Sequence, residues 1–365
     1  HIKLYKRENS KYWQMKVKMP KLKAIRSSTG SKILKDAEKI ALKYYSSISS
    51  KTNIKLKRSK NIFKKIHLVE TADLTKKEIE HILDESKKYI TFNKRKIKKI
   101  NVLEGRTIFN LFFEDSTRTR TSFEVAAKRL GADLINVVVK DSSINKGETL
   151  LDTMTTINSM NPDVLIVRHP EEGISKKISE TVDASVINAG DGSHEHPTQA
   201  LLDAYSIRER LAGIEGKKVV IVGDILHSRV ALSNIFALQK LGAEIMVCGP
   251  ATLIPKYIST LGVKVELDIK KALNWCDAAN ILRIQFERQK MPYFPSLREY
   301  ILYYGVNEEI IKALDKEIII LHPGPINRGI EITSRVADAD NALILDQVEN
   351  GVAIRMAILY LLARK

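Results

Sequence analysis

Short apolar runs alternate with amphipathic segments over residues 61–365. In the first half, each run ends at polar residues or at glycine and is too short for a helix. These runs predict buried strands at 107–113, 133–139, 164–167 and 185–188. Helical spacing of apolar residues separates them at 123–130 and 150–160. Because strands that alternate with helices form mostly parallel sheets, we expect an α/β fold.

A second series of the same kind begins at Gly216. Helical spacing appears at 230–241, and the apolar runs predict strands that end at Val222, Cys248, Leu282 and Leu321. We therefore expect two doubly wound parallel-sheet domains. The turn after Val222 lacks the second and third glycines of a Gly-x-Gly-x-x-Gly fingerprint, which argues against a dinucleotide site.

Two further helices are predicted, one before the first α/β series and one after the second. Residues 72–83 predict an amphipathic helix, with Asp73 or Thr75 capping its start. Residues 346–362 predict a long amphipathic helix at the C-terminus. The apolar stretch at 351–363 is shorter than the roughly 18 residues of a membrane span and contains a charged arginine, so we expect no membrane partner.

Positive charge is concentrated at the N-terminus. Residues 1–60 contain 18 Lys and Arg against 3 Asp and Glu, whereas residues 61–365 contain 42 against 40. The nearly neutral body argues against nucleic acid as a partner. We interpret residues 1–60 as a basic extension with a possible helix at 31–45. Its composition is typical of a solvated tail, an organelle-targeting segment or a polyanion-binding arm.

The cysteine content indicates a reducing compartment. Two cysteines, Cys248 and Cys276, do not make a disulfide framework in a chain of 365 residues. We expect the cytoplasm, with organelle targeting by the basic segment as the alternative.

The stretch 112–124 predicts a phosphate-binding turn between a strand and a helix. It contains Ser116-Thr117-Arg118-Thr119-Arg120, which combines hydroxyl groups with two guanidinium groups. Unpaired backbone N–H groups at a helix start attract anions, and a guanidinium fork matches two phosphate oxygens. The alternative is an ordinary helix cap, since Thr121 and Glu124 match a capping box.

Further polar residues follow the other predicted strands. Arg168, Arg229 and Arg283 each stand at a strand end, and His196 begins the segment His196-Pro197-Thr198-Gln199. Ligands of parallel sheets bind beyond the carboxyl ends of the strands. Cations gathered there repel one another unless anions bind, so we expect an anionic ligand. His194 and His196 alone are too few ligands for a metal site, and we expect none.

These motifs, taken in order, resemble those of aspartate carbamoyltransferase catalytic chains. The resemblance runs from about residue 66 to the C-terminus and includes Lys146-Gly147-Glu148-Thr149, Arg168-His169-Pro170, Arg283-x-Gln285 and His322-Pro323-Gly324-Pro325. It implies a carbamoyl-phosphate-binding domain at 61–203, completed by the C-terminal helix 347–365 packing back on it. It also implies an aspartate-binding domain at 204–346.

The resemblance implies transfer of the carbamoyl group of carbamoyl phosphate to the amino group of L-aspartate, an early step of pyrimidine synthesis, without a cofactor. It implies catalytic roles for Arg118, Thr119, Lys146, Arg168 and His196. It implies that carbamoyl phosphate is bound by Ser116, Thr117, Arg118, Thr119, Ser142, Lys146, Arg168, His196 and Gln199. It implies that aspartate is bound by Lys146, Arg229, Arg283, Gln285, Gly324 and Pro325. Many family members have leucine where this chain has Gly324.

In this family the loop that carries Lys146 and a nearby serine enters the active site of the neighbouring subunit. The resemblance therefore implies a homotrimer with shared active sites, and it specifies no regulatory chain. The serine is Ser142, with Ser143 as a close rival.

Two other functions compete with this assignment. Ornithine carbamoyltransferase shares the phosphate turn and the His-Pro-x-Gln segment, but its Asp-x-x-Ser-Met-Gly and His-Cys-Leu-Pro segments are not found here. Two arginines placed for a dicarboxylate favour aspartate. The second competitor is a non-catalytic protein that binds polyanions through residues 1–60.

Overall fold

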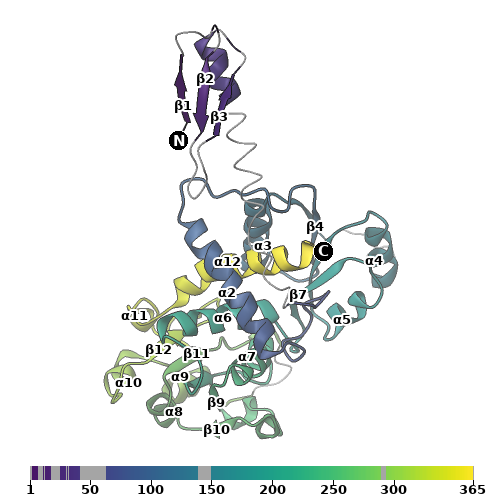
Figure 1. Ribbon diagram of the computed structural model, residues 1–365. Coiled ribbons are helices and arrows are strands. Elements are labelled where there is room, and N and C mark those ends of the chain that lie inside the picture. Colours follow the sequence, from purple (N-terminus) through teal and green to yellow (C-terminus); the bar gives the residue numbers. More distant parts are fainter. Residues whose placement is uncertain are drawn as a thin grey trace. The chain divides into compact units, whose positions relative to one another are not determined.

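The computed structural model describes residues 2–6, 11, 13–17, 25–29, 31, 33–41, 63–138, 149–288 and 293–364. The chain forms two compact units, His1–Asn61 (unit 1) and Ile62–Lys365 (unit 2), which we describe one at a time (Figure 1). The predicted residues Ser142, Ser143 and Lys146 lie outside the described ranges.

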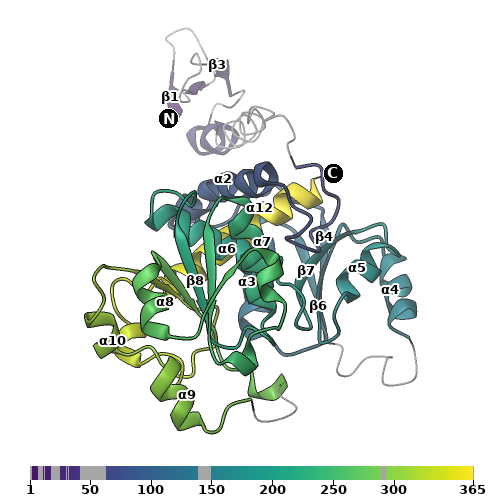
Figure 2. The same ribbon diagram turned by 90° about the horizontal axis from the view of Figure 1, so that it is seen from below.

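The first sheet of unit 2 is entirely parallel. Across the sheet its strands are β5 (Asp133–Val138), β4 (Thr107–Phe112), β6 (Val164–His169) and β7 (Ser185–Asp191). The helices associated with it are α3 (Thr117–Leu130), α4 (Leu150–Asn158), α5 (Ile174–Ser179) and α6 (Pro197–Arg210) (Figure 2). Successive strand residues face opposite sides, so Ile108 packs in the core with α3 and α6 while Phe109 packs with α4 and α5.

The second sheet of unit 2 is also parallel. Across the sheet its strands are β10 (Lys264–Glu266), β9 (Glu244–Cys248), β8 (Lys218–Val222), β11 (Ala278–Ile281) and β12 (Ile319–Leu321). Its helices are α7 (Arg229–Lys240), α8 (Ile269–Trp275), α9 (Leu297–Tyr304), α10 (Glu308–Lys312) and α11 (Ser334–Ala337). Three short 3-10 helices, η3 (Ala251–Leu253), η4 (Ile258–Leu261) and η5 (Phe286–Arg288), lie in its connections. Two parallel sheets with helices on both faces confirm the expected fold class.

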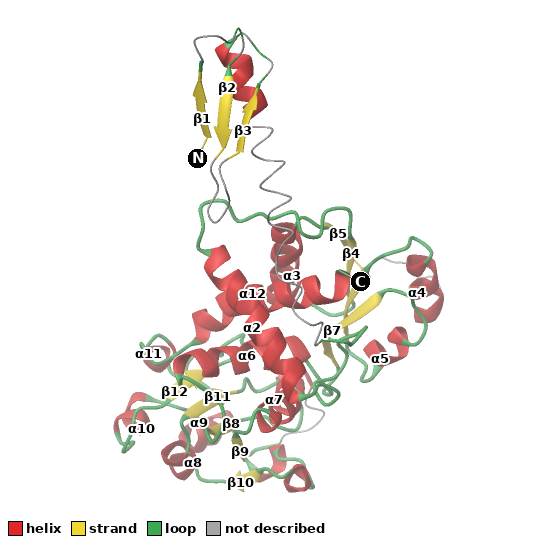
Figure 3. Cartoon of the chain, viewed as in Figure 1, coloured by secondary structure: helices red, strands yellow, loops and turns green. Residues whose placement is uncertain are grey.

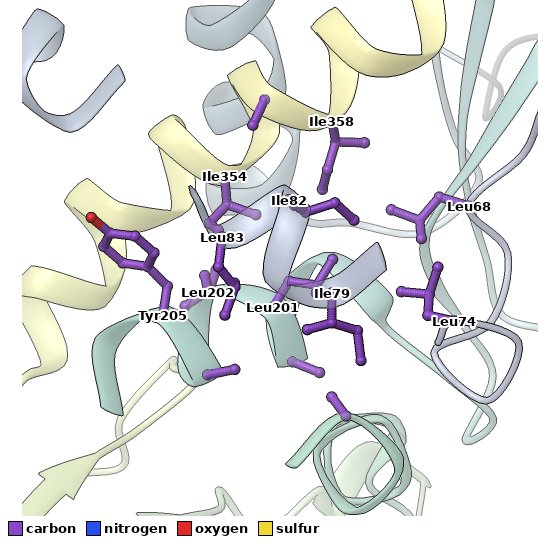
Figure 4. Packing of buried hydrophobic residues seen from close by; sticks show 14 of the residues in the cluster. Leu68, Leu74, Ile79, Ile82, Leu83, Leu201, Leu202, Tyr205, Ile354 and Ile358 are labelled. Carbon is purple, nitrogen blue, oxygen red and sulfur yellow. The ribbon is translucent and has the colours of Figure 1, made fainter. Parts of the chain in front are cut away.

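One continuous hydrophobic cluster joins the two sheets. It contains Ile108 of β4 and Ile221 of β8, together with residues of α2 (Lys76–Asn93) and α12 (Ile344–Ala363). Ile354 and Ile358 of α12 face Ile82 and Leu201 across the interior (Figure 4). The C-terminal helix therefore packs on helices of the first sheet, as expected. No helix in the described ranges combines the length and apolarity that a bilayer crossing requires.

The start of α2 follows its sequence signature. Thr75 is the N-cap, its side chain accepts from the Glu78 backbone N–H, and the Glu78 carboxylate accepts from the Thr75 N–H at 2.9 Å. This reciprocal pair is a capping box. The structure thus selects Thr75 rather than Asp73 as the cap.

Unit 1 contains a small antiparallel sheet that the basic composition did not lead us to expect. Its strands β1 (Ile2–Tyr5), β2 (Gln14–Val17) and β3 (Ile25–Ser28) pair in that order, and residues 34–41 are helical within the predicted segment 31–45 (Figure 3). Its strands alternate apolar and polar positions, but they are short and rich in lysine. The described residues of this basic extension therefore include a folded sheet and a helical stretch.

We predict that Ile358→Ala destabilises unit 2 by about 2–5 kcal/mol, because it removes a side chain that is 1% exposed and leaves a cavity under α2. Urea unfolding followed by circular dichroism measures the change. The matched control is Ile97→Ala at a side chain that is 76% exposed, where we expect a change within about 0.5 kcal/mol. Equal losses for the two variants would contradict the role assigned to α12.

Candidate active site

A cleft of about 990 Å³ opens where the carboxyl ends of strands from both sheets meet. Segments that follow β4, β7, β8, β11 and β12 line it, together with one face of α12. Predicted site residues that line the cleft are Ser116, Thr117, Arg118, Thr119, Arg168, His196, Gln199, Arg229, Arg283, Gln285, Gly324 and Pro325. The fold thus brings together every predicted site residue that lies within the described ranges.

The start of α3 forms one wall of the cleft. Its N-cap is Ser116, whose side chain makes no capping hydrogen bond, and the helix begins at Thr117 rather than near residue 123. Thr121 and Glu124 therefore lie inside the helix, and the predicted capping box is wrong; the Glu124 carboxylate accepts from Lys128 Nζ at 2.5 Å instead. The backbone N–H groups of the first turn have no acceptor within the helix, and the residues of this turn line the cleft.

A single carboxylate, that of Glu114, bridges the half-buried Arg168 and the buried Arg229, and lies 3.8 Å from Arg288 Nη2. Glu114 Oε1 lies 2.6 Å from Arg168 Nη2 and 2.5 Å from Arg229 Nη2. Because Arg168 ends β6 and Arg229 begins α7, this contact ties the first sheet to the second. A Cβ at Gly190, where φ is +116°, would come within 2.9 Å of the Arg229 guanidinium and 3.1 Å of the Arg168 guanidinium. Glycine at this position lets both side chains approach.

The electrostatics of this wall reflect crowded positive charge. Burial, and then Arg168, lower the pKa of Arg229 to about 10. Burial lowers the pKa of His196 well below its ordinary value, and Arg168, Arg355 and Arg229 lower it further. His196 is therefore a neutral imidazole at pH 7, which donates a hydrogen bond from one nitrogen only.

The opposite wall comes from the segment after β11. Arg283 forms an ion pair with Glu287, one turn further on in η5. The Gln285 side chain donates to the His227 carbonyl at 3.0 Å, which fixes its position at the cleft. Arg288 donates to the Gly192 carbonyl at 2.7 Å, a bond that links this wall to the first sheet.

The loop after β12 closes the cleft beside the phosphate turn. His322 Nε2 lies 3.1 Å from Glu331 Oε1, and His322 Nδ1 accepts from the Gly324 backbone N–H at 2.8 Å. Gly324 has φ of +65°, and a Cβ there would lie 2.9 Å from Arg118 Cζ. A leucine at this position would require the end of the Arg118 side chain to shift, so the glycine permits the observed position of this guanidinium.

Behind the cleft, one buried carboxylate joins four structural elements. Asp203 of α6 accepts from the side-chain amides of Gln199 at 2.8 Å, Gln347 at 2.7 Å, Asn234 at 2.8 Å and Asn280 at 3.1 Å. The Gln347 carbonyl oxygen in turn accepts from the His322 backbone N–H at 2.9 Å. Asp203 thus connects Gln199 in one wall of the cleft with the loop after β12 in another.

A second buried carboxylate supports His196. Glu195 Oε2 accepts from the Thr71 backbone N–H at 2.7 Å and from Ser233 Oγ at 2.9 Å. Ser233 Oγ accepts from the His196 backbone N–H at 2.7 Å. His196 is therefore held at the start of α6 by its neighbour Glu195 and by two distant segments, those of Thr71 and Ser233.

Comparison with known proteins identifies the family. The aspartate/ornithine carbamoyltransferase carbamoyl-P binding domain matches residues 66–209, and the Asp/Orn binding domain matches residues 215–362. The aspartate carbamoyltransferase catalytic subunit of Cytophaga hutchinsonii is 61% identical over 297 residues, which are 81% of this chain and 97% of that protein. The chain belongs to the aspartate carbamoyltransferase family.

Solved structures of this family have the same fold. The catalytic subunit of M. Jannaschii aspartate transcarbamoylase superimposes with a TM-score of 0.73 at 36% identity, covering 82% of this chain and 98% of that one. The Trypanosoma cruzi aspartate transcarbamoylase, in complex with carbamoyl phosphate and aspartate, gives a TM-score of 0.73 at 30% identity, covering 80% and 95%.

Glu114, Arg288 and Arg355 are among the residues of this carbamoyltransferase cleft that were not singled out from the sequence as site residues. Glu114 directly follows a predicted strand, and Arg355 interrupts an apolar helix; both positions are unusual for a charge without a partner. Arg355 donates to Ser122 Oγ at 2.9 Å and stacks on the Phe123 ring at 5.1 Å, so α12 supports the helix that begins at the phosphate turn.

We predict that Asp203→Asn lowers the free energy of unfolding by about 1–3 kcal/mol, because one acceptor oxygen becomes a donor that faces amide N–H groups. Urea unfolding measures it. The matched control is Asp84→Asn at an exposed carboxylate on α2 that pairs with Arg208, where we expect a change within about 1 kcal/mol. Unchanged stability of the Asp203 variant would contradict a stabilising role for this hydrogen-bond network.

Proposed function

We propose that this chain transfers the carbamoyl group of carbamoyl phosphate to the amino group of L-aspartate, giving N-carbamoyl-L-aspartate and phosphate. The observation that carries the proposal is the convergence of Arg118, Arg168, Arg229 and Arg283 on one cleft. Two small anions can neutralise this charge together. The relative from Trypanosoma cruzi, solved with carbamoyl phosphate and aspartate, supports the same pair of ligands.

The phosphate of carbamoyl phosphate binds at the start of α3. Ser116, Thr117 and Thr119 supply hydroxyl and backbone N–H donors, Arg118 supplies a charged fork, and Gln199 assists. The unsatisfied N–H groups of the first helical turn add the positive end of the helix dipole.

The carbonyl oxygen of carbamoyl phosphate is stabilised as it becomes negative. The amine nitrogen of aspartate forms a bond to the carbonyl carbon, the bond from that carbon to the phosphate oxygen breaks, and the leaving phosphate accepts the amine proton. Thr119, Arg168 and neutral His196 donate to the developing oxyanion. Removing one such donor typically costs roughly 10²–10³ in rate.

The carboxylates of aspartate bind to Arg229 and Arg283, with Gln285 assisting and Gly324 and Pro325 placed beside the amine. Arg229 now pairs with Glu114, and Arg283 with Glu287. A bound dicarboxylate competes for these guanidinium groups. On this proposal, residues 61–203 with helix 347–365 bind carbamoyl phosphate and residues 204–346 bind aspartate.

We predict carbamoylation of aspartate and none of ornithine when the two substrates are assayed side by side with carbamoyl phosphate. The cationic ornithine side chain would be repelled by Arg229 and Arg283, whereas a second carboxylate pairs with them. Turnover of ornithine without turnover of aspartate would overturn the substrate assignment.

The matched variants for this assay are Arg283→Gln and Arg298→Gln. Arg298, in α9, is exposed and does not line the cleft. We expect Arg283→Gln to raise KM for aspartate at least tenfold and to leave KM for carbamoyl phosphate within about twofold, because a lost charged hydrogen bond costs about 1.5–3 kcal/mol. Arg298→Gln leaves both unchanged.

We further propose a homotrimer in which Lys146, with Ser142 or Ser143, completes the active site of the neighbouring subunit. Family membership supports this arrangement. The buried, unpaired thiols of Cys248 and Cys276 support a reducing compartment such as the cytoplasm.

We predict that mixing two inactive variants, Lys146→Ala and Arg118→Ala, restores part of the activity after subunit exchange. A hybrid trimer contains some sites built from one intact Arg118 and one intact Lys146. Activity measured before and after exchange tests this, with exchange confirmed by mass spectrometry of intact assemblies. Exchange without recovered activity would contradict a shared site and leave the substrate assay unaffected.

A further inference from the structure

Unit 1 lies outside the region that the carbamoyltransferase family explains. Both family domains lie within residues 66–362. The alignment with the Cytophaga hutchinsonii relative covers 97% of that protein but 81% of this chain. The sheet of unit 1 therefore calls for a function of its own.

The two faces of this sheet differ in character. Strand alternation assigns Leu4 of β1 and Met15 of β2 to one face, and Met15 is 2% exposed. The helical residues 34–41 are also covered along one stripe, since Ala37 and Ala41 are buried. Apolar positions thus form the inner face.

The other face carries cations in register. Lys3 pairs with Lys16 across β1 and β2, and Lys16 pairs with Arg26 across β2 and β3. Like charges directly opposite one another destabilise a sheet. A row of three basic positions therefore favours an anionic partner that spans all three strands.

The neighbouring row consists of hydrogen-bonding residues. Tyr5 pairs with Gln14, and Gln14 pairs with Ser28. Each of these residues lies two positions along its strand from the basic row, so alternation places the two rows on the same face. Beside this row, Lys6 Nζ lies 5.8 Å from the Trp13 ring centre. The strands contain no acidic residue; the described acids of unit 1, Asp36 and Glu38, are in the helix.

We propose that this basic face binds double-stranded DNA. With strands about 4.8 Å apart, the basic row extends over about 10 Å from the first strand to the third, a span comparable to the width of a major groove, about 12 Å. The strand positions Lys3, Lys16 and Arg26 supply positive charge for the phosphates, and the row with Gln14 and Ser28 supplies hydrogen-bonding groups for the groove. β-Sheets are an established means of entering DNA grooves. The near-neutral charge of residues 61–365 still argues against nucleic acid at unit 2.

DNA fits this face better than a membrane does. A membrane-binding surface combines cations with large apolar side chains that enter the lipid. The exposed apolar residues of unit 1, Ile33, Leu34 and Ile40, belong to the helical segment and its start, whereas the cations in register belong to the sheet.

The test uses the full chain and a fluorescein-labelled 20-base-pair duplex of mixed sequence, with binding followed by fluorescence anisotropy between 50 and 200 mM salt. We expect a Kd in the range of about 10⁻⁴–10⁻⁶ M and a steep loss of affinity with salt. The variant K3Q/K16Q/R26Q should bind at least tenfold more weakly, and its slope of log affinity against log salt should be smaller by about 3, since each phosphate contact contributes about 0.9.

Two control variants keep the result specific. K87Q/K176Q/K270Q removes the same charge from exposed positions of unit 2, and K35Q/K39Q removes charge from the helical segment of unit 1. Both should bind DNA within about threefold of the unmodified chain, and all three variants should retain carbamoyl transfer. The proposal is overturned if the unmodified chain does not bind the duplex, or if the sheet variant binds as tightly as K87Q/K176Q/K270Q. It is equally overturned if phosphatidylserine vesicles or a hairpin RNA bind more tightly than the duplex.

Discussion

The active-site cleft depends on holding several guanidinium groups closer together than their charges favour. Glu114 provides the counter-charge between Arg168 and Arg229. Burial first, and then the neighbouring Arg168, lower the pKa of Arg229 to about 10. A carboxylate that bridges two cations also marks where a substrate anion gains most on binding. The unliganded cleft is thus arranged for anions before any arrive.

The frame behind the cleft resists this repulsion. A single hydrophobic cluster runs through both sheets, and α12 packs into it from the C-terminal end of the chain. Asp203 and Glu195 add buried hydrogen bonds that reach Gln199, His196 and the loop after β12. Since each carboxylate gathers donors from distant segments, the site residues keep their positions relative to one another.

Charge is divided between the two units according to their chemistry. Unit 2 is nearly neutral overall but brings several arginines together in one cleft, where small anions fit. Unit 1 has a large positive excess and presents basic strand positions in register across a sheet, where an extended polyanion fits. The first pattern serves carbamoyl transfer, and the second supports the proposed binding of DNA.

The sequence by itself determined the α/β class and predicted many residues that line the cleft, because buried strands are short apolar runs. Arg168 and Arg283 directly follow such runs, and Arg229 lies in the turn after another. The sequence narrowed the cap of α2 to Asp73 or Thr75, and the structure selected Thr75 through its contact with Glu78. Only the tertiary structure decided the start of α3, the bridging role of Glu114, and the buried networks of Asp203 and Arg355. Their hydrogen-bond partners lie in segments far apart in sequence. The local pattern of apolar residues does not predict which distant donor bonds to which acceptor.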